Sequence, residues 1–216
     1  MNPAHDAMNL DTSARVIHWA FWYDWMLKLI TLGREGRFRE KLLDLAGIAP
    51  GEIVLDAGCG PGTMAIAARR RVGPTGEVYG IDASPEMVER ARAKASRAGL
   101  DISFQRALLE ELPFPDSKFD LVTTSLVLHH FPAEVLPRCL TEIRRVLKPD
   151  GRLVAVDFVA SGHGHRLPLR RNHPHHTFDL NALTPILNEA GMVVRERGSA
   201  GFLGTAYIKA TRGAAA

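Results

Sequence analysis

Cysteine is scarce in this sequence of 216 residues, which contains only two, Cys59 and Cys139. They lie far apart in unlike contexts, so they match neither a zinc-binding pattern nor a disulfide framework. A reducing, cytoplasmic setting is the simplest one for such a chain, and we expect no metal site. No general base neighbours Cys59 in the sequence, so this cysteine is expected to pack rather than to react.

Long apolar runs are also absent. In the most aromatic stretch, residues 13–32, the uninterrupted apolar runs are shorter than the ~20 residues that a membrane-spanning helix needs. Polar residues interrupt it: His18, Asp24 and Lys28. Residues 1–14 have neither the basic start nor the apolar centre of a signal peptide. We therefore expect a flexible N-terminal tail, no signal peptide and no transmembrane helix.

The three tryptophans of the chain lie in this aromatic stretch at helical spacing: Trp19, Trp22 and Trp25. Such spacing places their rings near one face of a helix. Three roles fit that helix: packing against the main domain, a lid that excludes water from a site, or peripheral contact with a membrane surface. With a further helix expected over residues 34–46, it would form an N-terminal helical lid spanning residues 1–48.

A dense basic surface is the third missing feature. The net charge is only +3, with an isoelectric point near 9.1, and the charges are spread along predicted helix faces, so we expect no nucleic-acid partner. Five of the nine histidines cluster in residues 161–177 among arginines. Because Asp179 is the only acid nearby, this cluster does not predict a metal site. It fits either a substrate-facing loop for a carboxylate, phosphate or phenolate, or an ordinary exposed basic loop.

Strand and helix patterns alternate from residue 52 onward, which predicts one α/β domain, with a core over residues 49–216. We expect strands near 52–56, 77–82, 101–106, 119–124 and 151–158, and helices near 62–72, 84–98, 132–147 and 179–190. Two final extended segments, 193–197 and 203–210, are expected to form an antiparallel hairpin that closes the sheet.

An apolar strand pattern ending in an acid runs directly into three alternately spaced glycines: Val54-Leu55-Asp56-Ala57-Gly58-Cys59-Gly60-Pro61-Gly62. A helix pattern follows, so the glycines occupy a strand-to-helix turn, where doubly wound folds hold ligands. Glycine lets the backbone approach a ligand closely at a helix N-terminus. The dinucleotide pattern G-x-G-x-x-G would need a glycine at position 63, which is threonine. The turn therefore predicts a nucleoside cofactor other than a dinucleotide.

The next strand pattern ends in Asp82, where a carboxylate can accept hydrogen bonds from both ribose hydroxyls. The D-x-G-x-G-x-G turn and this acid resemble the class I S-adenosylmethionine-dependent methyltransferases. Further segments carry the resemblance: Tyr23-Asp24, Gly80 to Ser84, Leu112 to Asp116, Phe119 to Val122 and Arg145 to Leu153. They are similar to the small-molecule branch that includes ubiquinone/menaquinone-biosynthesis and phospholipid methyltransferases.

The resemblance implies a Rossmann-like, doubly wound, seven-stranded sheet, mostly parallel with an antiparallel C-terminal hairpin, and S-adenosylmethionine as the cofactor. The cofactor contacts it implies are Asp56, Gly58, Gly60 and Gly62 at the methionine end, Asp82 with Ala83 beside it at the ribose, Met87, Leu108 and Leu109 at the adenine, and Ser125 and Tyr23. Members of the family commonly have a polar residue and alanine at the two leucine positions. Adenine recognition is therefore expected to rely on backbone groups and apolar packing.

The segment after the fourth predicted strand, Ser125 to Pro132, lacks the Asn/Asp-Pro-Pro-aromatic turn of enzymes that methylate planar amines. It contains His129 and His130, which could remove a substrate proton or orient the substrate. Each could instead hydrogen-bond the backbone, and Ser125 could simply cap its strand. Both histidines are kept as candidate catalytic residues.

These features together predict in-line methyl transfer from S-adenosylmethionine to a small-molecule or lipid-like acceptor, with alignment in a water-poor site as the main contribution of the protein. Two alternatives stay open: a non-catalytic protein that binds S-adenosylmethionine, and an NAD-dependent oxidoreductase, against which the glycine spacing argues.

Overall fold

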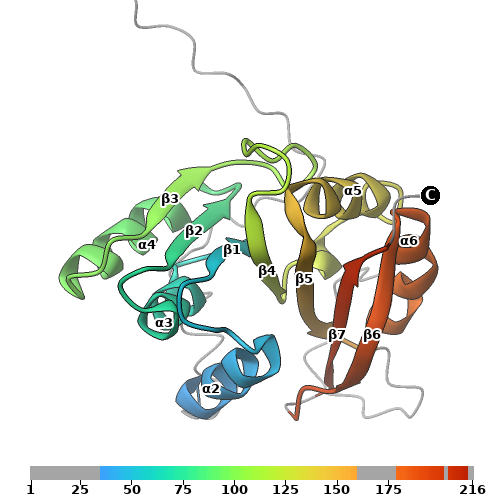
Figure 1. Ribbon diagram of the computed structural model, residues 1–216, viewed down its shortest axis with the longest axis horizontal. Helices are drawn as coiled ribbons and strands as arrows, with labels where there is room; N and C mark the ends of the chain where they lie inside the picture. The colour runs from blue at the N-terminus through green and yellow to red at the C-terminus, as the bar shows by residue number, and fades with distance from the viewer. Residues whose placement is uncertain (1–34, 160–178, 202–203, 214–216) are drawn as a thin grey trace, which may run out of the picture.

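A computed structural model describes residues 35–159, 179–201 and 204–213 (Figure 1). Seven strands form one sheet in the order β3-β2-β1-β4-β5-β7-β6. The strands are β1 (Ile53–Ala57), β2 (Glu77–Asp82), β3 (Ser103–Arg106), β4 (Phe119–Ser125), β5 (Leu147–Phe158), β6 (Met192–Ser199) and β7 (Thr205–Arg212). The helices are α2 (Glu35–Ala46), α3 (Thr63–Val72), α4 (Pro85–Arg97), α5 (Leu136–Val146) and α6 (Leu183–Glu189), with short 3-10 helices η1 (Leu128–His130) and η3 (Leu180–Ala182).

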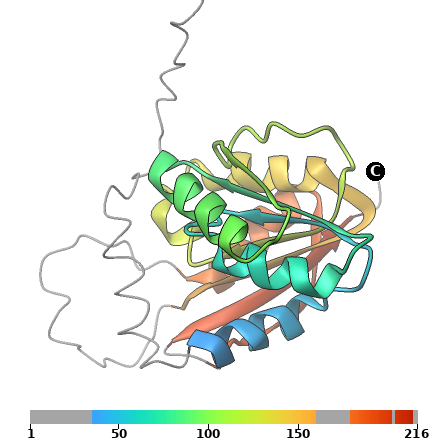
Figure 2. The ribbon, with the colours of Figure 1, turned by 90° about the vertical axis from the view of Figure 1, so that its left-hand side faces the viewer.

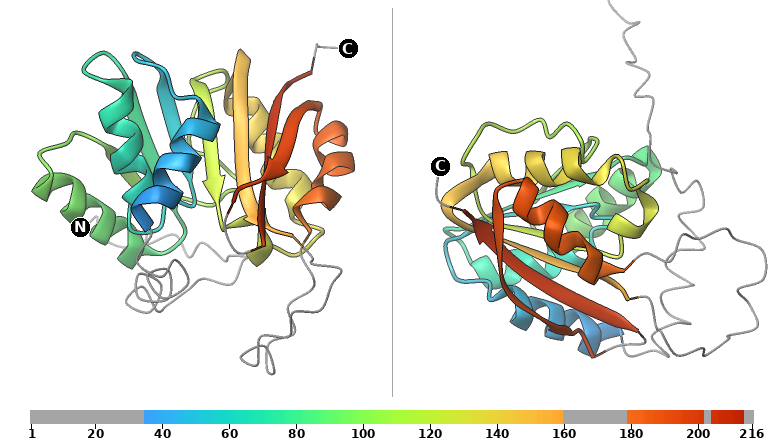
Figure 3. Two further views of the ribbon diagram at one scale, coloured as in Figure 1. Left: turned by 90° about the horizontal axis from the view of Figure 1, so that it is seen from below. Right: turned by 90° about the vertical axis from the view of Figure 1, so that its right-hand side faces the viewer.

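The predicted sheet topology is confirmed. Strands β1 to β5 are parallel where they pair, whereas β7 runs antiparallel to both β5 and β6. The chain adds strands outward from β1 to β3 and then, in the other direction, β4, β5 and the edge strand β6, with β7 inserted last between β5 and β6. The order therefore reverses between β1 and β4. Ligands of such folds bind at this reversal, beyond the carboxyl ends of the strands. Figure 3 shows the strands side by side, with β6 at one edge.

Helices cover both faces of the sheet, because the central strands are apolar on both sides and must be buried on both. One core contains Val54 and Leu121 and packs against α2, α3 and α4. The other contains Leu55 and Val122 and packs against α5 and α6. Neighbouring residues of one strand thus enter opposite cores, as strand geometry requires. Figure 2 shows α5 on one side of the sheet and α2 and α3 on the other.

Several predicted boundaries differ from the structure by two or more residues, among them the starts of three elements. The helix expected over 132–147 begins at Leu136, because residues 132–135 form a turn in which Val135 N–H donates to the Pro132 carbonyl at 3.0 Å. The strand expected from residue 101 begins at Ser103. The strand expected from residue 151 begins at Leu147, which pairs with Phe119 before the register shifts.

The helix expected over residues 34–46 is confirmed as α2. The rest of the predicted N-terminal lid, which includes Tyr23 and the three tryptophans, lies outside the described residues, and so does the histidine-rich segment 161–177. Within the described ranges, no helix is long and apolar enough to cross a membrane.

Candidate cofactor and acceptor site

The glycine turn follows β1 at the point where the strand order reverses. Gly58, Gly60 and Gly62 have φ values of +77°, +50° and +75°, a backbone region that residues with a side chain rarely adopt. A Cβ added at Gly58 would lie 2.5 Å from Val127 Cγ2, and one at Gly62 would lie 2.7 Å from the Cβ of Ala91. Glycine is therefore required at these two positions by protein packing as well as by backbone conformation.

Asp82, at the end of β2, holds the turn in place. Its Oδ2 accepts a hydrogen bond from the Gly60 N–H at 2.8 Å, and its Oδ1 accepts one from the Ser84 N–H at 2.9 Å. Partial burial raises the pKa of this carboxyl, and the two N–H donors oppose the rise. One carboxylate thus connects the glycine turn to the start of α4, at the position that the sequence predicts for the ribose.

Asp56 is the most buried acid of the turn, with only 2% of its surface exposed. The register places it beside Thr123 of β4, whose hydroxyl donates to Asp56 Oδ1 at 3.2 Å. Burial raises the pKa of Asp56 from 3.8 to about 7, with Thr123 and the Ala65 backbone N–H opposing the rise. Within the described part of the chain, Asp56 Oδ2 has no hydrogen-bond partner.

An unpartnered, buried carboxylate oxygen is unfavourable unless a donor reaches it. The ammonium group at the methionine end of S-adenosylmethionine is a donor of the right charge. This orphaned oxygen, beside a backbone turn made of glycines, therefore fits the cofactor that the sequence predicts.

The residues predicted to contact adenine fall into two environments. Met87 is buried in the first turn of α4, where its N–H donates to Ser84 Oγ at 3.3 Å. Leu109 is a buried member of the core that also contains Leu112 and Phe114, whereas Leu108 is half-buried. Leu108 is thus the better placed of the two leucines to reach a ligand.

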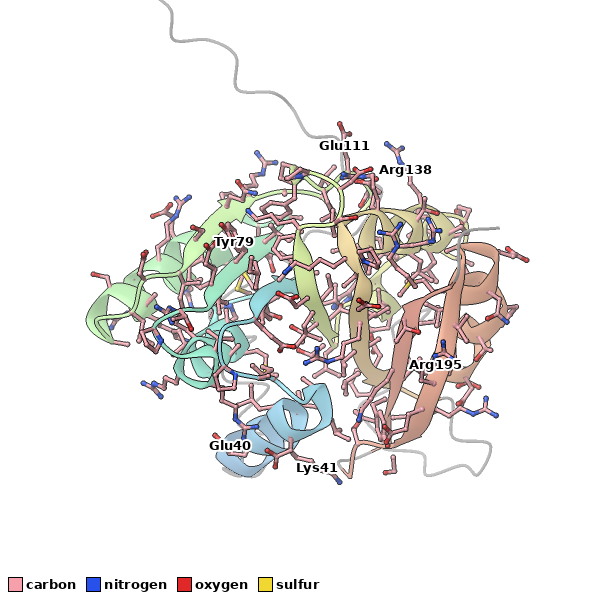
Figure 4. The ribbon with its side chains drawn as sticks, in the orientation of Figure 1. Glu40, Lys41, Tyr79, Glu111, Arg138 and Arg195 are labelled. Carbon is pink, nitrogen blue, oxygen red and sulfur yellow. The ribbon has the colours of Figure 1, made fainter. Side chains whose placement is uncertain are left out.

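The segment that carries both leucines is fixed to α5 and to neighbouring loops by arginines. Arg138 Nε donates to the Glu110 carbonyl at 3.1 Å, and its guanidinium lies 3.9 Å from Glu111 at the rim of the molecule (Figure 4). Ala83, also half-buried, accepts a hydrogen bond from Arg106 at 3.2 Å through its carbonyl. The predicted adenine side of the site therefore includes backbone that arginine side chains at the surface hold in place.

The chain turns sharply where β4 ends. Ser125 is the last residue of the strand, and Leu126 has a φ of +58°, which costs a residue with a side chain roughly 1–2 kcal/mol. The Leu126 N–H still donates to the Val156 carbonyl at 2.8 Å. The turn places η1, with the two predicted catalytic histidines, at the same edge as the glycine turn.

His129 is held by an acid that the sequence analysis missed, Asp157 at the end of β5. The His129 Nδ1 lies 2.7 Å from Asp157 Oδ1, and the His129 N–H donates to Asp157 Oδ2 at 3.3 Å. The ring of His130 packs against that of His129 at an interplanar angle of 45°, with centroids 3.9 Å apart. Asp157 ends the apolar run Leu153 to Val156 in the way that Asp56 and Asp82 end theirs, so the same signal could have identified it.

A cavity of about 560 Å³ lies beyond the end of β5. Its polar lining is contributed by η3, β6 and the start of β7: Asn181, Arg197, Ser199 and Thr205. Val159, two residues after Asp157, also lines it. The cavity lies on the opposite side of the strand reversal from the residues predicted to hold ribose and adenine.

Comparison with known proteins agrees with this geometry. A family model described as "Methyltransferase domain" matches residues 54–151. The chain is 38% identical over 138 residues to a "2-phytyl-1,4-naphtoquinone methyltransferase" of Trichormus variabilis, covering 63% of this chain and 59% of that protein. It is also 38% identical over 136 residues to a "Demethylmenaquinone methyltransferase" of Thermus thermophilus, covering 63% and 60%. The match thus spans about three fifths of the length of these curated relatives.

A solved structure extends the likeness beyond the matched domain. A "SAM dependent methyltransferase from Aquifex aeolicus" has 26% sequence identity and a TM-score of 0.70, covering 87% of this chain and 96% of that one. The matched domain contains the complete glycine turn and the strand-end acids Asp56 and Asp82. Residues 54–151 match a methyltransferase-domain family model and the fold resembles that of a solved S-adenosylmethionine-dependent methyltransferase, so the chain contains a domain similar to the class I S-adenosylmethionine-dependent methyltransferases.

Proposed function

We propose that this protein transfers a methyl group from S-adenosylmethionine to a small, quinone-like aromatic acceptor. The observation that carries the proposal is the glycine turn bordered by two strand-end carboxylates, one of which, Asp56, keeps a buried oxygen without a partner among the described residues. When bound, S-adenosylmethionine supplies an activated methyl group, so no covalent nucleophile is required of the protein.

The residues of the chain then have separate roles in this proposal. Asp56 receives the ammonium group, Asp82 receives the ribose hydroxyls while it holds Gly60, and Leu108 contacts the adenine. On the other side of the strand reversal, His129 takes a proton from the acceptor. Positioning and exclusion of water contribute most of the rate enhancement in such a site.

A quinone-like acceptor is proposed on two grounds. The two relatives named above act, by their names, on a naphthoquinone and on demethylmenaquinone. The cavity beyond β5 has amide, guanidinium and hydroxyl groups in its lining, which are suitable donors for quinone or quinol oxygens. The experiment for the acceptor is methylation of a 1,4-naphthoquinol with a short alkyl chain, detected by mass spectrometry.

Cofactor binding is tested at Asp82. Asp82→Ala is expected to weaken the binding of S-adenosylhomocysteine at least tenfold, about 1.4 kcal/mol, because it removes a charged acceptor for the ribose and releases Gly60. Isothermal titration calorimetry measures the change. The matched control is Asp150→Ala, an exposed acid of β5, which should bind like wild type. Unchanged affinity in a folded Asp82→Ala protein, or tighter binding of NADH than of S-adenosylhomocysteine, would contradict the proposal.

The aromatic segment 13–32 keeps its three predicted roles, which tryptophan fluorescence can separate because all three tryptophans lie there. If the segment contacts a membrane surface, adding anionic vesicles shifts the emission to the blue, and salt reduces the shift by screening. No shift at low salt would exclude membrane contact. Removal of residues 1–30 then distinguishes a lid, which leaves a folded domain with weak binding, from a core helix, whose loss prevents folding.

A further inference from the structure

Asp157 is a fully buried acid whose carboxylate contacts the segment that carries His129. It has 0% exposed surface. Its Oδ1 accepts the N–H of Phe158 at 2.8 Å and lies 2.7 Å from His129 Nδ1, while its Oδ2 lies 3.3 Å from the His129 N–H. Both of the backbone groups can only donate, so both carboxylate oxygens act as acceptors.

These contacts determine how the imidazole of His129 is protonated. An acceptor at Oδ1 requires a donor at Nδ1, and a neutral imidazole carries only one ring proton. That proton is therefore on Nδ1, which leaves the basic lone pair on Nε2. The ring of Phe158 contacts the His129 ring edge-on, with centroids 5.1 Å apart, and the ring of His130 packs against it. The orientation of the imidazole is thus restricted by neighbouring side chains as well as by Asp157.

We propose that Asp157 is a positioning residue for proton removal by His129. This inference rests on the proposed function. In the step, Nε2 of His129 takes the hydroxyl proton of the quinol acceptor, and the electron pair of the broken O–H bond stays on the acceptor. The loss of this proton makes the aromatic ring more nucleophilic. The imidazolium that forms is stabilised by the adjacent Asp157 carboxylate, as in other sites where an acid orients a histidine.

The tautomer of His129 tests the positioning role without any substrate. Nitrogen NMR of the histidine rings in the full-length protein, with His129 assigned through the His129→Gln variant, should show Nδ1 protonated and Nε2 unprotonated in wild type. In Asp157→Asn, the loss of the carboxylate charge should weaken this preference and raise the share of neutral rings protonated on Nε2. Protonation of Nε2 in the wild-type neutral ring would overturn the proposal. This wild-type result is decisive even if the Asp157→Asn protein does not fold.

Kinetics with the naphthoquinol test whether Asp157 acts through His129. Asp157→Asn and His129→Gln are each expected to lower kcat about 100-fold, with S-adenosylhomocysteine affinity unchanged. The double variant should be no slower than His129→Gln alone, because removing the base leaves nothing for Asp157 to orient. A further loss in the double variant, or a loss confined to KM, would show a merely structural role for Asp157 and overturn the proposal. An inactive wild type would refute the quinol acceptor, and the NMR result would still decide the tautomer.

Discussion

The unliganded protein is expected to lose stability as the pH rises, because of Asp56. Its pKa is about 7 in the folded chain against 3.8 in the unfolded one. Below the lower value the Asp56 carboxyl is protonated in both the folded and the unfolded state, so it does not change the stability with pH. Between the two values the unfolded state loses its proton while the folded state keeps it, so rising pH favours unfolding. The difference between these two pKa values corresponds to about 4 kcal/mol of unfolding free energy, fully lost at pH values above 7.

Urea unfolding of wild type and Asp56→Asn at a series of pH values measures this contribution. The difference between the two proteins should change by about 4 kcal/mol between roughly pH 4 and pH 8, with the asparagine variant gaining relative to wild type as the pH rises. Asp150→Asn, which changes an exposed acid, serves as the control and should follow the wild-type curve. Parallel curves for Asp56→Asn and wild type would show that the buried carboxyl does not keep its proton.

Gly58→Ala is expected to destabilise the fold by roughly 2–5 kcal/mol. A side chain at a φ of +77° costs about 1–2 kcal/mol, and overpacking against a buried neighbour typically costs about 1–3 kcal/mol more. The neighbour here is Val127, whose Cγ2 would lie 2.5 Å from the new Cβ. Urea unfolding gives the free energy of each variant.

Two variants separate the packing contribution from the backbone contribution. Gly99 has a φ of +63° and no atom of the described residues within 4 Å of an added Cβ, so Gly99→Ala should cost only the backbone part, about 1 kcal/mol. Val127→Ala introduced into Gly58→Ala should recover part of the packing loss. If Gly58→Ala is no less stable than Gly99→Ala, the close approach of Val127 is not what requires glycine there.

Local patterns in the sequence predict most of the fold and identify the glycine turn with its neighbouring acids. The acids that end β1 and β2 follow apolar runs, and the glycine spacing is itself a backbone requirement, so both could be recognised from neighbouring residues. The start of α5 was predicted too early because the turn before Leu136 interrupts a helical pattern. Both Leu108 and Leu109 are predicted at the adenine because position alone does not say how deeply each of two adjacent leucines is buried.

The structural partners of the site residues could not be predicted in this way. Position 62 must be glycine because Ala91 of α4 packs against it, and Ala91 lies 29 positions further along the chain. His129 and Asp157 are 28 residues apart, and Asp56 and Thr123 are 67 apart. Such pairs depend on strand order and register, which no local pattern contains.

The sequence alone therefore determined the order of the elements, the glycine turn and the resemblance to a family, because periodicity and glycine spacing act over a few neighbouring residues. The tertiary structure decided which buried acid acts on which group. The reversal of strand order between β1 and β4 places Asp56 beside Thr123, and the parallel pairing of β4 with β5 places Asp157 beneath His129. The chemistry proposed for the site follows from these contacts, because the hydrogen-bond donors around a buried carboxylate decide which of its forms is favoured.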